Sequence, residues 1–302
     1  MPLLVLVAFL VLAGPVNAVG GSCAGPLAVQ VLGSGGPEID AHRASSGYLV
    51  WIDGHARVLV DLGGGTFTRF GASGARFEDL ELVALTHLHV DHAGDLPALL
   101  KGGFFTERTR PLVLAGPTGG GDFPDLEGFL LGLIGPDHGA FRYLRGYLDG
   151  GRGLIRLDRR TLDAGSREPM PVYRDGDLMV TALGVTHGPV PALAYRVAYG
   201  HKSIGFSGDQ IGDDPEVAEF FSGVDLLVMH HAVPENTGRI PASLHALPSE
   251  IGSIAEAAGA GHLLLSHLMH RSERALPESL DLIGRRFKGR ISVAEDLMCV
   301  AP

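Results

Sequence analysis

Cysteine is scarce in this chain: 302 residues contain only two, Cys23 and Cys299, near the two ends. Neither stands in a motif typical of a catalytic thiol, so we expect no cysteine chemistry at a functional site. In an oxidising compartment the two could join the N-terminal and C-terminal segments through a disulfide. The alternative, which the sequence leaves open, is a pair of unbonded and partly buried thiols.

Runs of basic residues are also absent. The chain has 34 acidic and 24 basic side chains, which give a formal charge of −10. Nucleic-acid surfaces need clustered Lys and Arg to displace counterions, so we expect no nucleic-acid partner and instead a small-molecule substrate. A composition of 45% hydrophobic and 19% charged residues excludes a disordered chain and is typical of a globular protein with a sizeable core.

Charged side chains are missing from residues 1–18. The apolar run Leu3–Leu12 is too short for a membrane span of about 20 residues, and Val16-Asn17-Ala18 has the small residues of a cleavage site. We therefore expect a signal peptide that is removed after Ala18, leaving a periplasmic or secreted protein with no stable membrane insertion. A retained N-terminal anchor is the alternative.

Short apolar runs separated by Gly-rich turns indicate strands, interrupted by a few helical stretches. They predict two similar α/β halves in a single domain, residues 19–302, with two sheets packed together and helices outside. Residues 135–170 are irregular and rich in Gly and Arg, and we expect them to form an insertion near the site. The expected strands are 27–32, 47–52, 56–61, 80–85, 178–185, 192–199, 203–207, 226–229 and 262–266, and the expected helices are 96–100, 126–134 and 249–258.

The strongest chemical signal is a cluster of histidines after the expected strand 80–85. Three histidines and an aspartate follow within six residues, in the order His87, His89, Asp91 and His92. Side chains at positions i and i+2 of an extended loop can face one ion. Imidazole and carboxylate ligands suit zinc and do not require redox chemistry.

Three further residues occur where apolar strands end: His187, Asp209 and His267. In a two-sheet sandwich such strand ends converge on one edge, so ligands that are distant in sequence can meet there. We therefore expect these residues to complete the metal site.

These motifs resemble the metallo-β-lactamase superfamily and, within it, the tRNase Z/arylsulfatase-like branch. The resemblance also includes Leu32–Gly36, Val60–Thr66 and Leu227–Ala232. It implies a four-layer αββα sandwich with two Zn²⁺ ions per chain. The implied ligands are His87, His89 and His187 for one ion and Asp91, His92 and His267 for the other, with Asp209 bridging them.

The resemblance also implies catalytic roles. Two zinc ions would activate a shared hydroxide, Asp91 would orient it or accept its proton, and His245 would act as the general acid for the leaving group. Arg271 follows the last ligand, as an Arg does in this branch, and could either bind an anionic substrate or pair with a carboxylate. Phe104 and Phe105 could form a wall of the substrate pocket. Dimers are common in similar proteins, so a homodimer is an open expectation.

Position 231 departs from the branch. In tRNase Z-like enzymes a Glu stands there and supports the general acid, whereas this chain has His231. A carboxylate raises the pKa of a neighbouring imidazole and a second imidazole does not. Assisted departure of a poor leaving group, such as a ribose oxygen of RNA, is therefore disfavoured.

The preferred function is an exported dizinc hydrolase that cleaves a small ester, with a phosphoester or sulfate ester preferred. A β-lactamase is the alternative, because it uses the same chemistry on an amide carbonyl. A tRNA 3′-processing endonuclease and an iron redox enzyme are less favoured, the latter because His89 replaces the carboxylate it would need. A zinc-stabilised binding module is the non-catalytic alternative.

Overall fold

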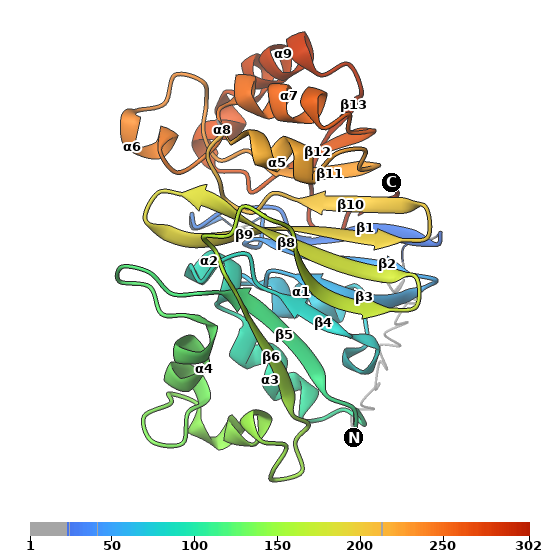
Figure 1. Ribbon diagram of the computed structural model, residues 1–302, viewed down its shortest axis with the longest axis vertical. Coiled ribbons are helices and arrows are strands. Elements are labelled where there is room, and N and C mark those ends of the chain that lie inside the picture. Colours follow the sequence, from blue (N-terminus) through green and yellow to red (C-terminus); the bar gives the residue numbers. More distant parts are fainter. Residues whose placement is uncertain (1–22, 24, 41, 213) are drawn as a thin grey trace, which may run out of the picture.

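The computed structural model of the chain describes residues 23, 25–40, 42–212 and 214–302. Two seven-stranded sheets pack face to face, and helices cover the outer side of each (Figure 1). This confirms the predicted four-layer αββα sandwich. The predicted signal peptide, residues 1–18, lies outside the described residues. Among the described residues, no helix is long and apolar enough to cross a membrane.

The first sheet has the strand order β14-β1-β2-β3-β4-β5-β6. Successive residues of its strands enter opposite cores: Val29 and Val31 face the second sheet, whereas Ala28 and Leu32 face the helices. Both faces are covered, so these strands read as continuous apolar runs. The strands are β1 (Leu27–Gly33), β2 (Gly47–Ile52), β3 (His55–Val60), β4 (Leu82–Ala84), β5 (Leu112–Pro117), β6 (Leu157–Leu162) and β14 (Cys299–Val300).

The second sheet has the order β13-β12-β11-β10-β9-β8-β7. Strands β7 to β10 pair antiparallel and β10 to β13 pair parallel, so the carboxyl ends of β10, β11 and β12 lie at one edge. The strands are β7 (Met170–Asp175), β8 (Leu178–His187), β9 (Val190–Tyr199), β10 (Lys202–Phe206), β11 (Leu226–His230), β12 (His262–Ser266) and β13 (Arg290–Val293).

Helices form the two outer layers. Apolar residues of α1, α3, α4 and the 3-10 helix η2 pack on the first sheet, and those of α5, α7 and α9 pack on the second. The helical elements are α1 (Thr66–Ala72), η1 (Phe77–Asp79), α2 (Val90–Ala93), α3 (Leu96–Gly103), α4 (Leu126–Ile134), η2 (Arg142–Leu148), α5 (Pro215–Phe220), α6 (Arg239–Ala242), α7 (Pro248–Ala257), α8 (His270–Arg274) and α9 (Leu276–Arg286).

The expectation that residues 135–170 are irregular is wrong in part. They include η2 and strand β6, which pairs parallel with β5 at the edge of the first sheet. Charged side chains at Asp158, Arg159 and Arg160 interrupt the apolar pattern of β6. An edge strand tolerates such residues, so hydropathy alone did not reveal it.

The two cysteines form a disulfide, with 5.7 Å between their Cα atoms. Of the two alternatives that the sequence left open, the structure therefore has the disulfide and not the pair of unbonded thiols. The bond fixes the chain before β1 to β14, a two-residue strand that pairs with β1. Asp296, just before β14, accepts hydrogen bonds from Ser34 and from the Ala44 backbone, so the C-terminal segment also holds the loops near the site.

Candidate metal centre

The predicted ligands come from loops that follow four strands. The loop after β4 carries His87, His89, Asp91 and His92, while β8 ends at His187. Asp209 follows β10, and His267 follows β12. The structure brings these side chains together at one edge of the sandwich, as expected from their positions at strand ends.

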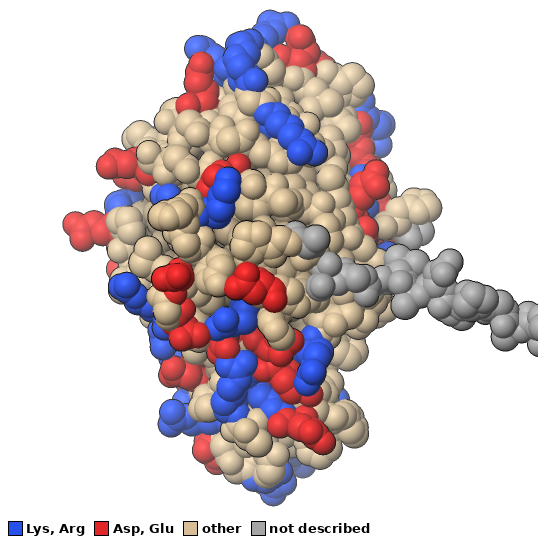
Figure 2. Space-filling view, turned by 90° about the vertical axis from the view of Figure 1, so that its right-hand side faces the viewer, with Lys and Arg blue, Asp and Glu red and all other residues tan. Residues whose placement is uncertain are grey.

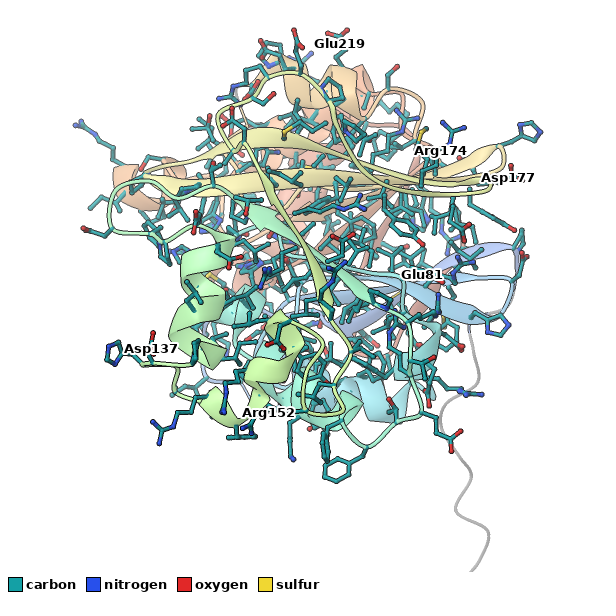
Figure 3. All side chains as sticks on the ribbon, turned by 60° about the horizontal axis from the view of Figure 1, so that its bottom comes forward. Glu81, Asp137, Arg152, Arg174, Asp177 and Glu219 are labelled. Carbon is teal, nitrogen blue, oxygen red and sulfur yellow. A yellow bond between two sulfur atoms is a disulfide. The ribbon has the colours of Figure 1, made fainter. Side chains whose placement is uncertain are left out.

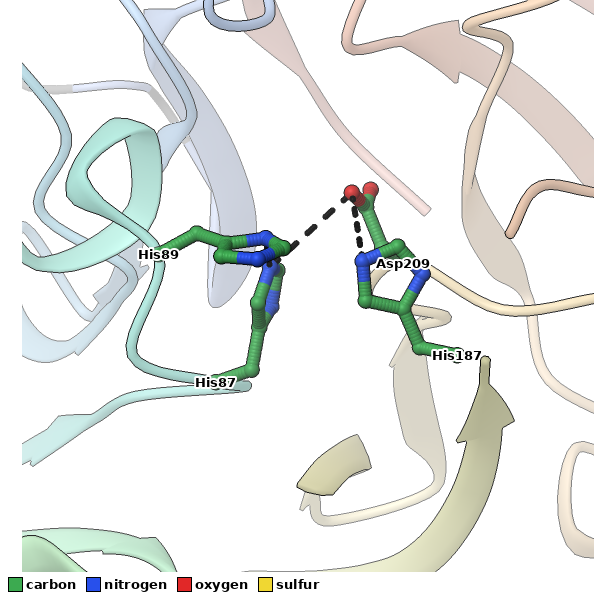
Figure 4. Close-up of side chains that lie close together, drawn as sticks. All are labelled: His87, His89, His187 and Asp209. Carbon is green, nitrogen blue, oxygen red and sulfur yellow. Dashed lines mark hydrogen bonds and ion pairs between the residues drawn. The ribbon is translucent and has the colours of Figure 1, made fainter. Parts of the chain in front are cut away.

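The first ligand cluster consists of His87, His89, His187 and Asp209. Their ligand atoms all lie within 4.8 Å of one another. Asp209 Oδ2 is 3.6 Å from His187 Nε2 and 3.9 Å from His87 Nε2, as the dashed lines of Figure 4 show. Three residues of this cluster are buried, and His89 is half-buried.

The second ligand cluster consists of His92, Asp209, His230 and His267, all buried. Asp91 lies beside it, with its Oδ2 3.2 Å from His267 Nε2 and 3.5 Å from His92 Nε2. Asp209 belongs to both clusters. A carboxylate between two sets of histidines is the arrangement expected of a bridging ligand.

Hydrogen bonds on the outer ring nitrogens prepare two histidines for metal binding. His92 Nδ1 donates to Asp61 at 2.8 Å, and His187 Nδ1 donates to the Leu244 carbonyl at 2.7 Å. These bonds leave Nε2 of each ring buried without a hydrogen-bond partner among the described residues. Buried nitrogens without a partner are costly, and a metal ion would satisfy them.

Electrostatics also favour cations at this edge. Burial opposes ionisation of Asp209, but the surrounding histidines, first His267 and His245, hold its pKa well below the usual range. Burial lowers the pKa values of His87 and His187, which keeps both rings in the neutral form that binds metals. Burial also opposes protonation of His92 and His267, but the neighbouring carboxylates outweigh it and raise the pKa values of these two rings. The donor set of imidazoles and carboxylates fits divalent ions such as zinc.

Two glycines allow the backbone to approach the site. A Cβ on Gly36 would lie 2.7 Å from Cε1 of His267, and one on Gly63 would lie 2.0 Å from the Asp91 carbonyl oxygen. Any side chain at either position would displace a predicted ligand. This explains the glycines in two of the motifs that carry the resemblance.

Asp61 and His230 were not predicted as site residues. Asp61 also accepts hydrogen bonds from the Thr86 amide and hydroxyl. His230 Nδ1 donates to Asp209 Oδ1 at 2.7 Å, and its Nε2 lies 3.2 Å from the Tyr48 hydroxyl. Because both nitrogens are engaged, His230 suits orienting Asp209 better than binding an ion. Both residues stand at the ends of buried strands, which is the signal that identified His187.

His245 lies beside both clusters on the loop after α6. Its Nδ1 is 3.7 Å from Asp209 Oδ2, and its ring centroid is 5.4 Å from that of His187. Burial lowers its pKa to about 3. The predicted general acid is therefore placed next to the predicted ligands.

His231 is buried, and neither of its ring nitrogens has a hydrogen-bond partner among the described residues. Burial lowers its pKa to about 4. His231 therefore makes no hydrogen bond to His245. Arg271 donates from Nε to the Ala232 carbonyl at 3.0 Å, and no ion pair joins it to a carboxylate of the described residues.

Phe104 and Phe105 lie at the C-terminal end of α3, where they are 47% and 75% exposed. They contact each other and Lys101. Their role as walls of a substrate pocket stays a prediction.

The sequence matches the model of one protein family, the Metallo-beta-lactamase superfamily, over residues 42–243. The chain belongs to this superfamily. It is 27% identical to a Ribonuclease Z of Mycolicibacterium paratuberculosis over 281 residues, which cover 89% of this chain and 96% of that protein. A Ribonuclease Z of Mycobacterium sp. (strain KMS) is 30% identical over 260 residues, covering 80% and 84%.

Among solved structures, the short form of human tRNase Z is similar in fold. Its TM-score is 0.68 at 21% identity, and the match covers 91% of this chain and 98% of that one. Together with the two ligand clusters, the superfamily match shows that the protein is a metal-dependent hydrolase of the metallo-β-lactamase fold.

Proposed function

We propose that this metallo-β-lactamase-fold hydrolase is exported, binds two zinc ions and cleaves small esters, preferably phosphoesters or sulfate esters. The observation that carries the proposal is the pair of His/Asp clusters that share Asp209. His87, His89 and His187 would hold one ion, and Asp91, His92 and His267 the other. Bound there, the ions would lower the pKa of a water molecule and so supply the nucleophile.

The chain's own residues position and protonate the reactants. His230 fixes the Asp209 carboxylate, and Asp61 fixes the ring of His92. Asp91 Oδ2 lies 3.2 Å from His267 Nε2 at the rim of the second cluster, where it can orient the attacking water. His245 faces the shared carboxylate and can donate a proton to a leaving group. Arg271 pairs with no carboxylate of the described residues and is available to an anionic substrate.

The surroundings of His245 favour substrates with good leaving groups. Among the described residues, no carboxylate hydrogen-bonds to its ring, and His231, which occupies the place of the branch's Glu, makes no hydrogen bond to it. Burial lowers the pKa of His245 to about 3, although Asp209, 3.7 Å from its Nδ1, favours the protonated ring. Activated phosphoesters and sulfate esters need little proton transfer as they leave, so they suit such a site better than RNA does.

Cleavage of tRNA is the second candidate, because the relatives named above are called Ribonuclease Z. The charge of this chain speaks against it. On the face drawn in Figure 2, Lys and Arg lie among Asp and Glu instead of forming a continuous basic surface, and the formal charge of the chain is −10. Phosphate backbones are bound mainly through such positive surfaces.

Export is supported by the disulfide between Cys23 and Cys299, because structural disulfides persist mainly in oxidising compartments. A protein outside the cytoplasm would not meet precursor tRNA. The same location suits a β-lactamase, so β-lactams belong among the substrates to be tested.

The test compares four substrates on one zinc-loaded preparation: bis(p-nitrophenyl) phosphate, p-nitrophenyl sulfate, a chromogenic cephalosporin and a precursor tRNA. The proposal predicts the highest kcat/KM on the phosphate or sulfate ester. Dominant turnover of the cephalosporin would assign a β-lactamase, and dominant tRNA cleavage would assign a tRNA endonuclease.

A His245→Ala variant tests the proton donor. We expect its rate on alkyl esters, which have poor leaving groups, to fall at least about tenfold more than its rate on p-nitrophenyl esters. Equal losses on both would remove the general-acid role. Zinc content measured on the same variant separates this effect from damage to the metal site.

A further inference from the structure

A group of exposed rings lies outside the two ligand clusters. The aromatic surface, as we call it, consists of Lys101, Phe104 and Phe105 of the α3 end and Phe141 and Tyr143 at the start of η2. The four rings are between 36% and 75% exposed. Large apolar side chains that gather on a surface usually mark a binding site.

One lysine organises this surface. Lys101 Nζ lies 4.5 Å from the ring centroid of Phe104, 4.7 Å from that of Phe105 and 5.6 Å from that of Tyr143. Phe141 and Tyr143 are also in ring contact, with centroids 6.4 Å apart. No carboxylate of the described residues pairs with Lys101. The cation is therefore held among rings and remains free to meet an anion from outside.

The aromatic surface continues toward the metal centre. Phe141 lines an apolar cavity of about 270 Å³ together with Val90, Pro97, Phe129 and Leu133. Val90 is 76% exposed and stands between the predicted ligands His89 and Asp91. A partner bound to the aromatic surface would thus lie next to the loop that carries four ligands.

The charge around these rings is positive, in contrast to the chain as a whole. Residues 141–160 contain six Arg and two Asp. Arg142, Arg145 and Arg152 form no ion pair with a carboxylate of the described residues. Figure 3 shows Arg152 projecting from the loop that follows η2, at the end of the molecule formed by the outer helices of the first sheet. The nearest acidic residues along the chain are Glu107, Asp137 and Asp149, and Asp149 accepts a hydrogen bond from the Gly151 amide.

Aromatic rings combined with unpaired cations match one kind of partner best. Exposed Phe and Tyr rings and lysines with an apolar stem insert at the boundary between lipid head groups and acyl chains, and anionic head groups attract Lys and Arg. A twofold contact with a second copy would instead bring Lys101 and the arginines against their own counterparts. We propose that the aromatic surface docks this protein on anionic phospholipid membranes.

The test uses a chain that begins at residue 19, because the apolar run Leu3–Leu12 could bind lipid by itself and lies outside the described residues. Its co-sedimentation is measured with vesicles of phosphatidylglycerol and phosphatidylcholine in equal parts and with vesicles of phosphatidylcholine alone. We expect binding to the anionic vesicles that weakens with added salt. The double variant Phe104→Ser/Phe105→Ser should bind at least about tenfold more weakly, and Lys101→Glu should lose binding mainly to the anionic vesicles.

Met179→Ser is the matched control. Met179 is 44% exposed on β8 of the other sheet, so its loss should leave vesicle binding unchanged. Thermal melting and zinc content of each variant check that the fold is intact. Absence of binding by the unaltered chain, or equal binding by the double variant, would overturn the proposal. So would a dimer in sedimentation velocity that the double variant dissociates, because the surface would then belong to a second copy.

Discussion

The two ligand clusters share Asp209 but are built differently. In the second cluster every member is buried, and Asp61, Tyr48 and Asp91 contact its histidines. In the first cluster the Leu244 carbonyl and the Thr86 hydroxyl hold His187 and His87, but His89 is half-buried, and its Nδ1 lies 3.0 Å from Nε2 of His87. The proposed ion position at the second cluster is therefore enclosed by the protein core, whereas the one at the first cluster opens toward solvent beside His89.

Asp209→Asn should have the largest effect, because it removes the charge that both clusters use. We expect bound zinc to fall well below two ions per chain. We expect kcat to fall by more than about 100-fold, because loss of a residue that only supports a ligand already reduces activity by up to about 100-fold. Metal analysis of the purified variant and its rate on bis(p-nitrophenyl) phosphate measure the two effects. Retention of both ions would contradict the bridging assignment.

Asp61→Asn should affect the two clusters unequally. Asp61 contacts His92 directly and reaches His87 through the Thr86 hydroxyl, so the variant should weaken zinc binding at the second position by about 10–100-fold and at the first position by less. A competitive zinc titration with a chromophoric chelator resolves the two affinities. Equal weakening of both positions would show that the clusters are not independently supported.

Replacement of His231 should have a smaller effect, on stability alone. Its folded pKa of about 4 is depressed by burial below an unfolded value near 6.5. Between these pH values the unfolded chain binds the extra proton, so acidification destabilises the fold there. In His231→Gln the loss of unfolding free energy from pH 7 to pH 5 should be about 2 kcal/mol smaller than in the unaltered protein.

Urea unfolding of the metal-free proteins at both pH values measures this difference. His42→Gln is the control for the loss of an exposed imidazole. If His231→Gln has the same pH dependence as the unaltered protein, His231 is not a neutral buried group.

Much of the fold was predictable because its strands are apolar on both faces. The runs 47–52, 126–134 and 262–266 coincide with β2, α4 and β12 residue for residue. Strand β6 escaped prediction because an edge strand carries charged side chains. Strands β13 and β14 are short and only partly buried, so their hydropathy is too weak to distinguish them from loops.

The candidate site was predictable to the extent that its residues are chemically unusual. Four ligands stand in six residues, and three more end apolar strands, so each could be found from residue type and position. The residues that support the ligands could not be found in this way. An aspartate before a glycine-rich turn, such as Asp61, reads as turn chemistry, and only the fold shows that it lies 2.8 Å from His92. His231 is buried without a hydrogen-bond partner among the described residues, and no local sequence pattern predicts that burial.

The central claim is that the protein holds two unequal metal positions joined by Asp209, and native mass spectrometry during titration with a chelator tests it most directly. We expect a zinc-loaded chain with two ions that loses them in two separate steps, through a populated one-ion form. The Asp61→Asn variant should also pass through a one-ion form. In that variant the ion that leaves first should be the one at the second cluster. A chain that binds a single ion, or that loses both ions in one step, would contradict the account.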